Sequence, residues 1–192
     1  MIRVGILGEI GSGKSYVSNK FGYPVFNADF EVSKLYKKDK KTFYKLNKEL
    51  PKYISSFPID KNEISNAILS SNSNFRKILK IVHKEIKKKL YSFLKKNKNK
   101  NKKIVILDIP LILENKISNK KDVLVFVDSP KKEIRKRLKK RPNYNNKLLK
   151  KFKKIQFTPV YKKRKAQFII KNKFTKKSVS IGVKNILKKI LK

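Results

Sequence analysis

The chain has 192 residues, of which 39% are hydrophobic, enough to build a packed core and to exclude a disordered polymer. It has no cysteine and one histidine, which excludes disulfide bonds, thiolate catalysis and cysteine-based zinc sites and disfavours a histidine-built metal site. No apolar run approaches the ~20 residues that span a bilayer. Residues 1–7 are too short, and too soon broken by glycine, for a signal peptide. We therefore expect a cytoplasmic protein of one domain, with room for a sizeable insertion.

The formal net charge is +40, from 53 Lys+Arg against 13 Asp+Glu. Such a basic surplus is typical of nucleic-acid-binding proteins. Lysine, asparagine and isoleucine are nevertheless used heavily nearly everywhere, including segment 95–103, whereas a dedicated binding face would concentrate the charge. Because these residue types share A/T-rich codons, we favour compositional drift, and the nucleic-acid interpretation stays open. Either way, the protein should attract anions.

The first half of the chain predicts two strands and several helices. Ile2–Leu7 is apolar apart from Arg3 and Gly5 and predicts a buried strand. Val25–Phe26 predicts a short second strand with Pro24 at its edge. Helical spacing of apolar residues predicts helices over 14–21, 29–50, 62–69 (capped by Asp60) and 74–96.

The second half alternates apolar strands with helices. Segments 104–107 and 123–127 are fully apolar and end at Asp108 and Asp128, and runs buried on both faces belong to parallel sheets that helices cover. The remaining predicted elements are a helix opening at Pro130, a helix over 148–157, a strand over 168–170 and a helix over 178–191. This alternation predicts a three-layer α/β/α fold with a parallel sheet. Residues 30–100 interrupt it as a mostly helical insertion over the carboxyl edge, where ligands bind in open α/β folds.

Residues 8–15 read Gly-Glu-Ile-Gly-Ser-Gly-Lys-Ser and match the phosphate-binding pattern Gly-x-x-x-x-Gly-Lys-Ser/Thr. The glycines allow backbone amides to approach phosphate oxygens closely, and Lys14 is placed to reach the β- and γ-phosphates. The Ser15 hydroxyl is a candidate ligand for Mg²⁺. The motif follows a predicted strand and opens a predicted helix, as this loop requires. We therefore predict a P-loop that binds ATP, with an ordinary flexible turn as the alternative; the loop alone does not separate kinases from other NTPases, and the remaining residues favour a kinase.

The rest of the chain resembles the dephospho-CoA kinase family. Segment 6–15 followed by Asn27-Ala28-Asp29 is similar to the family's P-loop and Asp-Ala-Asp strand end, and segment 107–115 is similar to its Asp-x-Pro-Leu-Leu-x-Glu segment. Further similarities are Ile81-Val82-His83 to Leu-His-Pro, Arg137–Arg141 to the lid, and Gln156, Lys162, Ala166 and Phe168–Asn172 to the C-terminal run. The resemblance covers almost the whole chain. It implies a single P-loop kinase domain over 1–192, with an acceptor-binding insertion at 30–100 and a lid region at 131–160.

Four positions depart from the family's pattern. Asn27 replaces the first Asp of Asp-Ala-Asp, Tyr16 replaces Thr, Lys84 replaces Pro, and Gln167 replaces an Asp. None of them removes the P-loop lysine, the second aspartate or the lid arginine. They bear on substrate details more than on the type of reaction.

The resemblance implies transfer of the γ-phosphoryl group of ATP to the 3′-hydroxyl of dephospho-CoA, the last step of coenzyme A biosynthesis. Asp29 is expected to orient the attacking hydroxyl and accept its proton, with a helix N-cap as the alternative. Lys14 and Arg141, assisted by Arg137, are expected to neutralise charge on the transferring group, although solvated arginines are the other interpretation. Asp108 is placed like a Walker-B carboxylate that holds Mg²⁺ through water, or else is a strand-end aspartate.

The implied sites fall into three groups. The ATP-binding residues are Gly11, Ser12, Gly13, Lys14, Ser15, Tyr16, Arg137, Arg141 and Asn172. The acceptor-binding residues are His83, Pro110, Leu111 and Glu114, with a packing role as the alternative for His83, and the metal ligands are Ser15 and Asp108. The expected partners are ATP with Mg²⁺ and dephospho-CoA, with no specific nucleic acid and no membrane; a monomer is expected, although the oligomeric state stays open.

Two other functions remain as alternatives. The first is an enzyme resembling a nucleoside monophosphate kinase, and segment 107–115 argues against it. The second is a basic P-loop protein that binds nucleic acid, and the even spread of lysines argues against it.

Overall fold

The structure of the protein is a computed structural model that describes residues 1–142 and 144–191. Its internal contacts divide the chain into two compact units. The first holds Met1–Asn27, Lys96–Asn145 and Phe152–Lys192, and the second holds Ala28–Lys95 and Asn146–Lys151. Within the described residues, no helix is both long enough and apolar enough to span a membrane.

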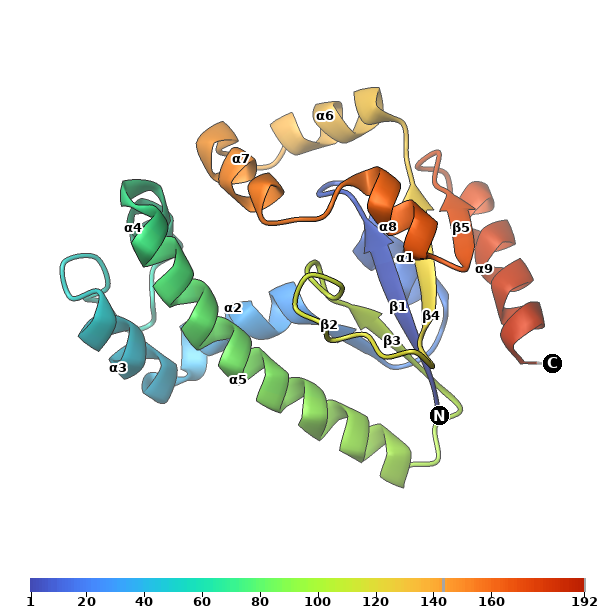
Figure 1. Ribbon diagram of the computed structural model, residues 1–192, viewed down its shortest axis with the longest axis horizontal. Coiled ribbons are helices and arrows are strands. Elements are labelled where there is room, and N and C mark those ends of the chain that lie inside the picture. The colour runs from blue at the N-terminus through green and yellow to red at the C-terminus, as the bar shows by residue number, and fades with distance from the viewer. Residues whose placement is uncertain (143, 192) are drawn as a thin grey trace. The chain divides into compact units, whose positions relative to one another are not determined.

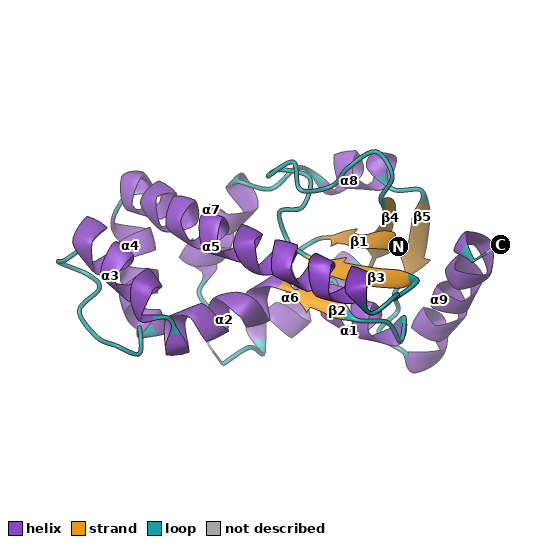
Figure 2. Ribbon diagram, turned by 90° about the horizontal axis from the view of Figure 1, so that it is seen from below, coloured by secondary structure: helices purple, strands orange, loops and turns teal. Residues whose placement is uncertain are grey.

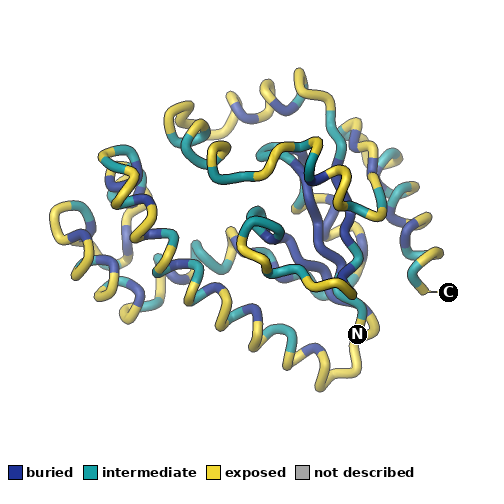
Figure 3. The backbone as a smooth tube through the Cα atoms, viewed as in Figure 1, coloured by how far each residue is buried: buried dark blue, intermediate teal, exposed yellow. Residues whose placement is uncertain are grey.

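A parallel sheet forms the centre of the first unit (Figure 1). Its five strands, counted over the described residues, are β1 (Ile2–Gly8), β2 (Val25–Asn27), β3 (Ile104–Asp108), β4 (Val123–Asp128) and β5 (Phe168–Lys171). They lie in the order β2-β3-β1-β4-β5, and every neighbouring pair is parallel. The central strands β1, β3 and β4 form the most continuously buried part of this unit (Figure 3). The parallel sheet predicted from the apolar runs is therefore confirmed.

Helices cover both faces of this sheet (Figure 2). On one face, α1 (Lys14–Lys20) and α9 (Lys176–Ile190) pack on alternate strand residues such as Val4, Ile6 and Val125 in one buried cluster. On the other face, α8 (Pro159–Lys165) contacts β1 and β4. The predicted three-layer α/β/α arrangement is thus present in the first unit.

The parallel direction brings the carboxyl ends of all the strands to one edge of the sheet. The strand register pairs Asn27 with Asp108 and Asp128 with Lys171 at this edge. Residues 8–15 leave β1 at the same edge, where Gly8 pairs with Val127. The edge therefore collects the phosphate-loop motif and the strand-end polar residues.

The second unit is helical. It contains α2 (Ala28–Lys38), α3 (Lys40–Glu49), α4 (Lys61–Ser70), α5 (Asn72–Asn99) up to Lys95, and the start of α7 (Asn146–Lys154). Its buried apolar residues include Leu35, Leu46, Ile54, Ile64, Ile68, Phe75, Ile78, Val82 and Ile86. Polar contacts add to this packing: the Ile59 amide donates to the Tyr36 carbonyl at 2.9 Å, and Lys45 pairs with Glu85 at 2.6 Å.

The structure corrects two of the predicted helices. The helix predicted over 29–50 is broken at Asp39, whose side chain caps α3. The helix predicted over 148–157 spans Asn146–Lys154, and α8 follows it as an element that the apolar pattern did not predict. Its signal was Thr158-Pro159, because Thr158 caps α8 and Pro159 occupies its first turn. The helix expected after Pro130 is α6 (Lys131–Lys139).

Replacing Asp39 by alanine tests the break between α2 and α3. The Thr42 amide donates to Asp39 Oδ1 at 2.9 Å, so Asp39→Ala should lower the free energy of unfolding by about 1 kcal/mol, as measured by urea denaturation. Asp39→Asn is the matched control, because it makes the same charge change but keeps an oxygen acceptor. Equal losses in the two variants would show that charge, not capping, is what Asp39 contributes.

Candidate active site

The phosphate-loop motif links β1 to α1 with backbone conformations that favour glycine. Gly11 and Gly13 have φ values of 88° and 86°, a region that L side chains rarely adopt. A Cβ at Gly11 would lie 2.9 Å from Leu138 Cγ of α6, and one at Gly13 would lie 2.6 Å from Asn172 Nδ2. Both glycines are therefore required for conformation and for close packing against neighbouring elements.

The Lys14 side chain folds back over this loop. Its Nζ donates to the Gly8 carbonyl at 3.2 Å and to the Glu9 carbonyl at 2.9 Å. A phosphate oxygen is a stronger partner for an ammonium group than a neutral carbonyl, because hydrogen bonds between two charged groups are the stronger class. The lysine is thus held beside the loop amides, ready to contact an anion that binds there.

Three side chains from three segments form one hydrogen-bonded group at the strand ends. The Nδ2 of Asn27, which ends β2, donates to Asp108 Oδ2 at 2.8 Å and to Ser15 Oγ at 3.3 Å. Asp108 ends β3 and is 3% exposed. The hydroxyl and carboxylate that the sequence proposes as magnesium ligands are therefore brought together, with Asn27 between them.

The comparisons with known proteins agree with this arrangement. The dephospho-CoA kinase family matches residues 2–177. The chain belongs to this family. A dephospho-CoA kinase from Wolbachia sp. subsp. Brugia malayi (strain TRS) is 32% identical over 187 residues, which are 96% of this chain and 95% of the relative.

Two solved structures resemble the chain in fold. A protein from Thermus thermophilus has a TM-score of 0.80 at 22% identity, over 100% of this chain and 98% of that one. The dephospho-CoA kinase from Campylobacter jejuni has a TM-score of 0.64 at 19% identity, over 98% of this chain and 96% of that one. The parallel α/β fold of P-loop kinases is thus shared along the whole chain.

Among the residues that the family resemblance assigns to ATP, Asn172 and Ser12 are in direct contact in the first unit. The buried Asn172 donates from Nδ2 to the carbonyl of Ser12 at 2.9 Å. Arg137, on α6, places its guanidinium carbon 4.6 Å from the centre of the Phe174 ring. Arg141 follows α6 and is exposed, and Tyr16 on α1 is 40% exposed.

The residues assigned to the acceptor are divided between the two units. Pro110 and Leu111 lie in the turn after β3. The Oε1 of Glu114 accepts from the Phe157 amide at 2.8 Å and pairs with Lys162 Nζ at 2.9 Å, so this carboxylate holds α8 and the segment before it. His83 lies on α5 in the second unit, where burial lowers the pKa of its imidazole and keeps it neutral near pH 7. Asp29 lies in the first turn of α2, also in the second unit.

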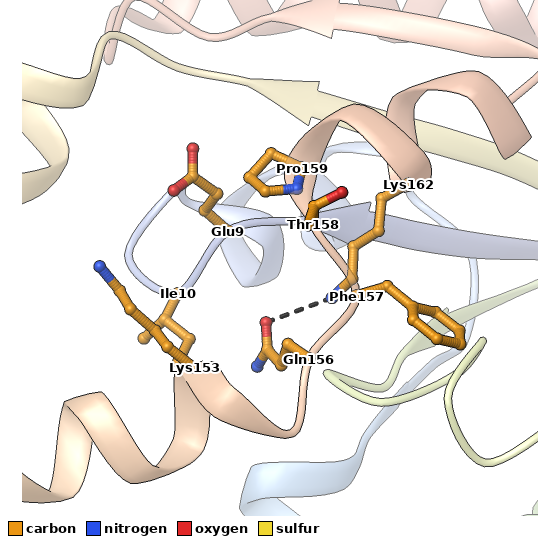
Figure 4. A pocket seen from close by; sticks show the side chains of 8 residues that line it. All are labelled: Glu9, Ile10, Lys153, Gln156, Phe157, Thr158, Pro159 and Lys162. Atoms are coloured by element: carbon orange, nitrogen blue, oxygen red, sulfur yellow. Dashed lines mark hydrogen bonds between the residues drawn. The ribbon is translucent and has the colours of Figure 1, made fainter.

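A pocket beside the phosphate loop has a volume of about 190 Å³ (Figure 4). Glu9 and Ile10 of the loop line one side, and Lys153, Gln156, Phe157, Thr158, Pro159 and Lys162 line the rest. Lys162 is 2% exposed, and its Nζ donates to Gln156 Oε1 at 3.2 Å. A buried, paired ammonium thus forms part of the pocket wall.

Sequence reasoning did not assign a role to Ser129, Phe174 or Glu9. Ser129 follows Asp128 at the end of an apolar strand, and that position was the available signal for a site residue. Phe174 contacts the site through a ring contact across 37 positions of the sequence, which no local pattern shows. Glu9 is within the recognised motif at a position where the pattern accepts any residue.

The Glu114–Lys162 pair gives a stability prediction. The side chains of Lys162 and Glu114 are 3% and 9% exposed, so Lys162→Met leaves a buried carboxylate without its cation and should cost about 3–5 kcal/mol in the free energy of unfolding. The double variant Lys162→Met with Glu114→Gln should recover much of that loss, because it removes the buried charge and keeps an acceptor for the Phe157 amide. Urea denaturation of both variants measures the difference. Equal stabilities in the single and double variants would contradict the pairing.

Proposed function

We propose that the protein is a dephospho-CoA kinase, which transfers the γ-phosphoryl group of ATP to the 3′-hydroxyl of dephospho-CoA and releases CoA and ADP. The observation that carries the proposal is a phosphate loop at the carboxyl edge of a parallel sheet, in a chain that the dephospho-CoA kinase family matches over residues 2–177. Phosphoryl transfer asks a protein for alignment and charge stabilisation more than for covalent chemistry. The backbone amides of the loop and the lysine and arginine side chains assigned to this site can supply both alignment and charge stabilisation.

The phosphate loop is the proposed donor site. Amides of Gly11, Ser12 and Gly13, with Lys14, bind the phosphates of ATP. Arg141, with Arg137 assisting, neutralises charge on the transferring group. Tyr16 and Asn172 complete this site, and the contact of Asn172 with the Ser12 carbonyl supports a role in shaping the loop.

The oxygen atoms of Ser15 and Asp108 are the proposed ligands for Mg²⁺. Within residues 1–142 and 144–191, no three His, Asp or Glu side chains form a cage for a metal ion. Mg²⁺ suits such a site, because it is usually bound by one or two protein oxygens together with substrate phosphates and water. When bound with ATP, Mg²⁺ supplies charge neutralisation at the phosphate oxygens. The contacts of Asn27 with both side chains hold their oxygen atoms close together.

Asp29 is the proposed acceptor of the proton from the attacking hydroxyl. In the chain it is two residues beyond Asn27, which ends β2 at the carboxyl edge. His83, Pro110, Leu111 and Glu114 are the proposed acceptor-site residues, with Glu114 acting through the segment that its carboxylate holds. We assign acceptor binding to the helical insertion at 30–100 and the lid to 131–160. We also propose that the enzyme acts in the cytoplasm as a monomer on these small molecules, with no nucleic-acid or membrane partner.

ADP release from purified protein with Mg²⁺ and ATP tests the reaction and the acceptor together. We expect strong stimulation by dephospho-CoA and none by nucleoside monophosphates, because the family match and segment 107–115 favour the acceptor of a dephospho-CoA kinase over that of a nucleoside monophosphate kinase. Stimulation by a nucleoside monophosphate instead would favour the related kinase class. A folded protein that binds ATP but shows no stimulation by either acceptor would overturn the proposal.

Substitution of Asp29 tests the proposed proton acceptor. Asp29→Asn should lower turnover by about a hundredfold or more while ATP binding stays nearly intact, because a general base acts on the chemical step and not on the donor. Asp60→Asn is the matched control, since it makes the same change at another helix start, where Asp60 caps α4. Steady-state kinetics and ATP titration measure both effects. Normal turnover in Asp29→Asn would remove Asp29 from the mechanism.

A further inference from the structure

Two side chains from two strand ends converge on one carbonyl oxygen of the phosphate loop. Ser129, which follows β4, donates from Oγ to the Ser12 carbonyl at 2.8 Å. Asn172, which follows β5, donates from Nδ2 to the same oxygen at 2.9 Å. These donors are 117 and 160 residues away from Ser12 in the sequence, so the sheet alone brings them to the loop.

Asn172 is itself held by its neighbours. Its backbone amide donates to the Asp128 carbonyl at 2.7 Å, and its Oδ1 accepts from the Phe174 amide at 2.8 Å. The side chain is also enclosed, because the residue is 1% exposed. The Nδ2 group therefore has a fixed direction, and Ser129 adds a second donor from the adjacent strand.

The direction of the Ser12 carbonyl sets the direction of the Gly13 amide. The two groups belong to one planar trans peptide, in which the C=O and N–H bonds point to opposite sides. With the oxygen fixed toward Ser129 and Asn172, the Gly13 N–H points away from these two side chains. A carbonyl held toward Ser129 and Asn172 thus leaves the Gly13 amide on the opposite side of the peptide, where it can donate to a ligand of the loop.

The Ser12–Gly13 peptide needs to be held in one orientation because its second residue is a glycine. Gly13 has φ 86° and ψ 24°, and glycine reaches positive and negative φ at similar cost. Rotation of the Ser12–Gly13 peptide would exchange a donor for an acceptor and turn a carbonyl oxygen toward the bound anion. Two donors on the Ser12 carbonyl oppose that rotation.

We propose that Ser129, together with Asn172, is a positioning residue that fixes the Ser12–Gly13 peptide so that the Gly13 amide donates to the polyphosphate of a nucleoside di- or triphosphate. The inference rests on the proposed function, because it requires the loop to bind the phosphates of the donor. Ser129 acts through the backbone and does not touch the nucleotide. Its hydroxyl therefore contributes to donor affinity and not to the chemical step.

The experiment compares three variants of the full chain by calorimetric titration with ADP. Ser129→Ala removes one donor to the Ser12 carbonyl, and its Kd for ADP should rise about tenfold, within the range for weakening a hydrogen bond to a charged group. Ser129→Thr keeps the hydroxyl and should restore the Kd to within about twofold of the wild type. Ser92→Ala is the matched control for ADP binding, because Ser92 Oγ also donates to a backbone carbonyl, that of Lys88, at 3.2 Å, at an exposed position of α5 in the second unit.

Kinetics and stability separate positioning from a general loss of structure. Ser129→Ala should raise the KM for ATP while kcat at saturating ATP and the KM for dephospho-CoA stay near the wild-type values. Its urea midpoint should fall by no more than the loss of one neutral hydrogen bond explains. A rise in Kd, with a fall in the midpoint no larger than this, supports the positioning role.

The outcomes distinguish this inference from the proposed function. If the wild-type protein binds ADP and Ser129→Ala binds it equally well, the inference is wrong and the proposed function stands. Failure of Ser129→Thr to restore a weakened Kd would also overturn it, because the hydroxyl would then not be the group that matters. If the wild-type protein does not bind ADP, the proposed donor site fails and this inference fails with it.

Discussion

The parallel direction of the strands is the constraint on which the candidate site depends. Each strand must end at the same edge of the sheet, so segments that are distant in the sequence deliver their following residues to one place. Residues 8–15 come from β1, Asn27 from β2, Asp108 from β3, Ser129 from β4 and Asn172 from β5. The hydrogen bonds among these residues directly join segments that end or follow different strands. An antiparallel strand in this sheet would carry its polar end to the opposite edge and leave the group incomplete.

The few acidic residues make specific structural contacts in a chain whose net charge is +40. Most of the 13 Asp and Glu residues occupy positions where a single carboxylate has a defined structural task. Asp39 and Asp60 cap helices, Glu63 accepts from Ser55 and Ser56, and Glu85 binds Lys45, which lowers the pKa of that carboxyl. Most of the lysines lie on the exposed surface, where each costs little because its ammonium stays in water, whereas the buried Lys162 is paired with Glu114. The even distribution means that the excess charge need not distort the fold, since repulsion is spread over many solvated groups.

Much of the fold was predictable from the sequence because its signals are local. Buried parallel strands are continuous apolar runs, and β3 and β4 stand out for that reason. The helical periodicity over 29–50 continued across Asp39, so the pattern alone did not show the break that capping produces. Helix α8 has few apolar residues and four basic ones in its last turn, so only Thr158-Pro159 marked it. Within the site, the motif identified Lys14 and Ser15, whereas the contacts of Ser12 with Ser129 and Asn172 depend on tertiary structure and have no local signature.

Asn27 shows why a departure from a family pattern is best interpreted through its contacts. The resemblance leads one to expect aspartate at this position, and the structure places the Asn27 amide nitrogen 2.8 Å from Asp108 Oδ2. A second carboxylate at that distance would repel the first and would require a proton or a cation between them. The amide instead donates to Asp108 and to Ser15, so the oxygen atoms of these two proposed ligands are held near each other by a neutral group. Relative to the family's pattern, asparagine at this position therefore lowers the negative charge at the proposed magnesium site by one.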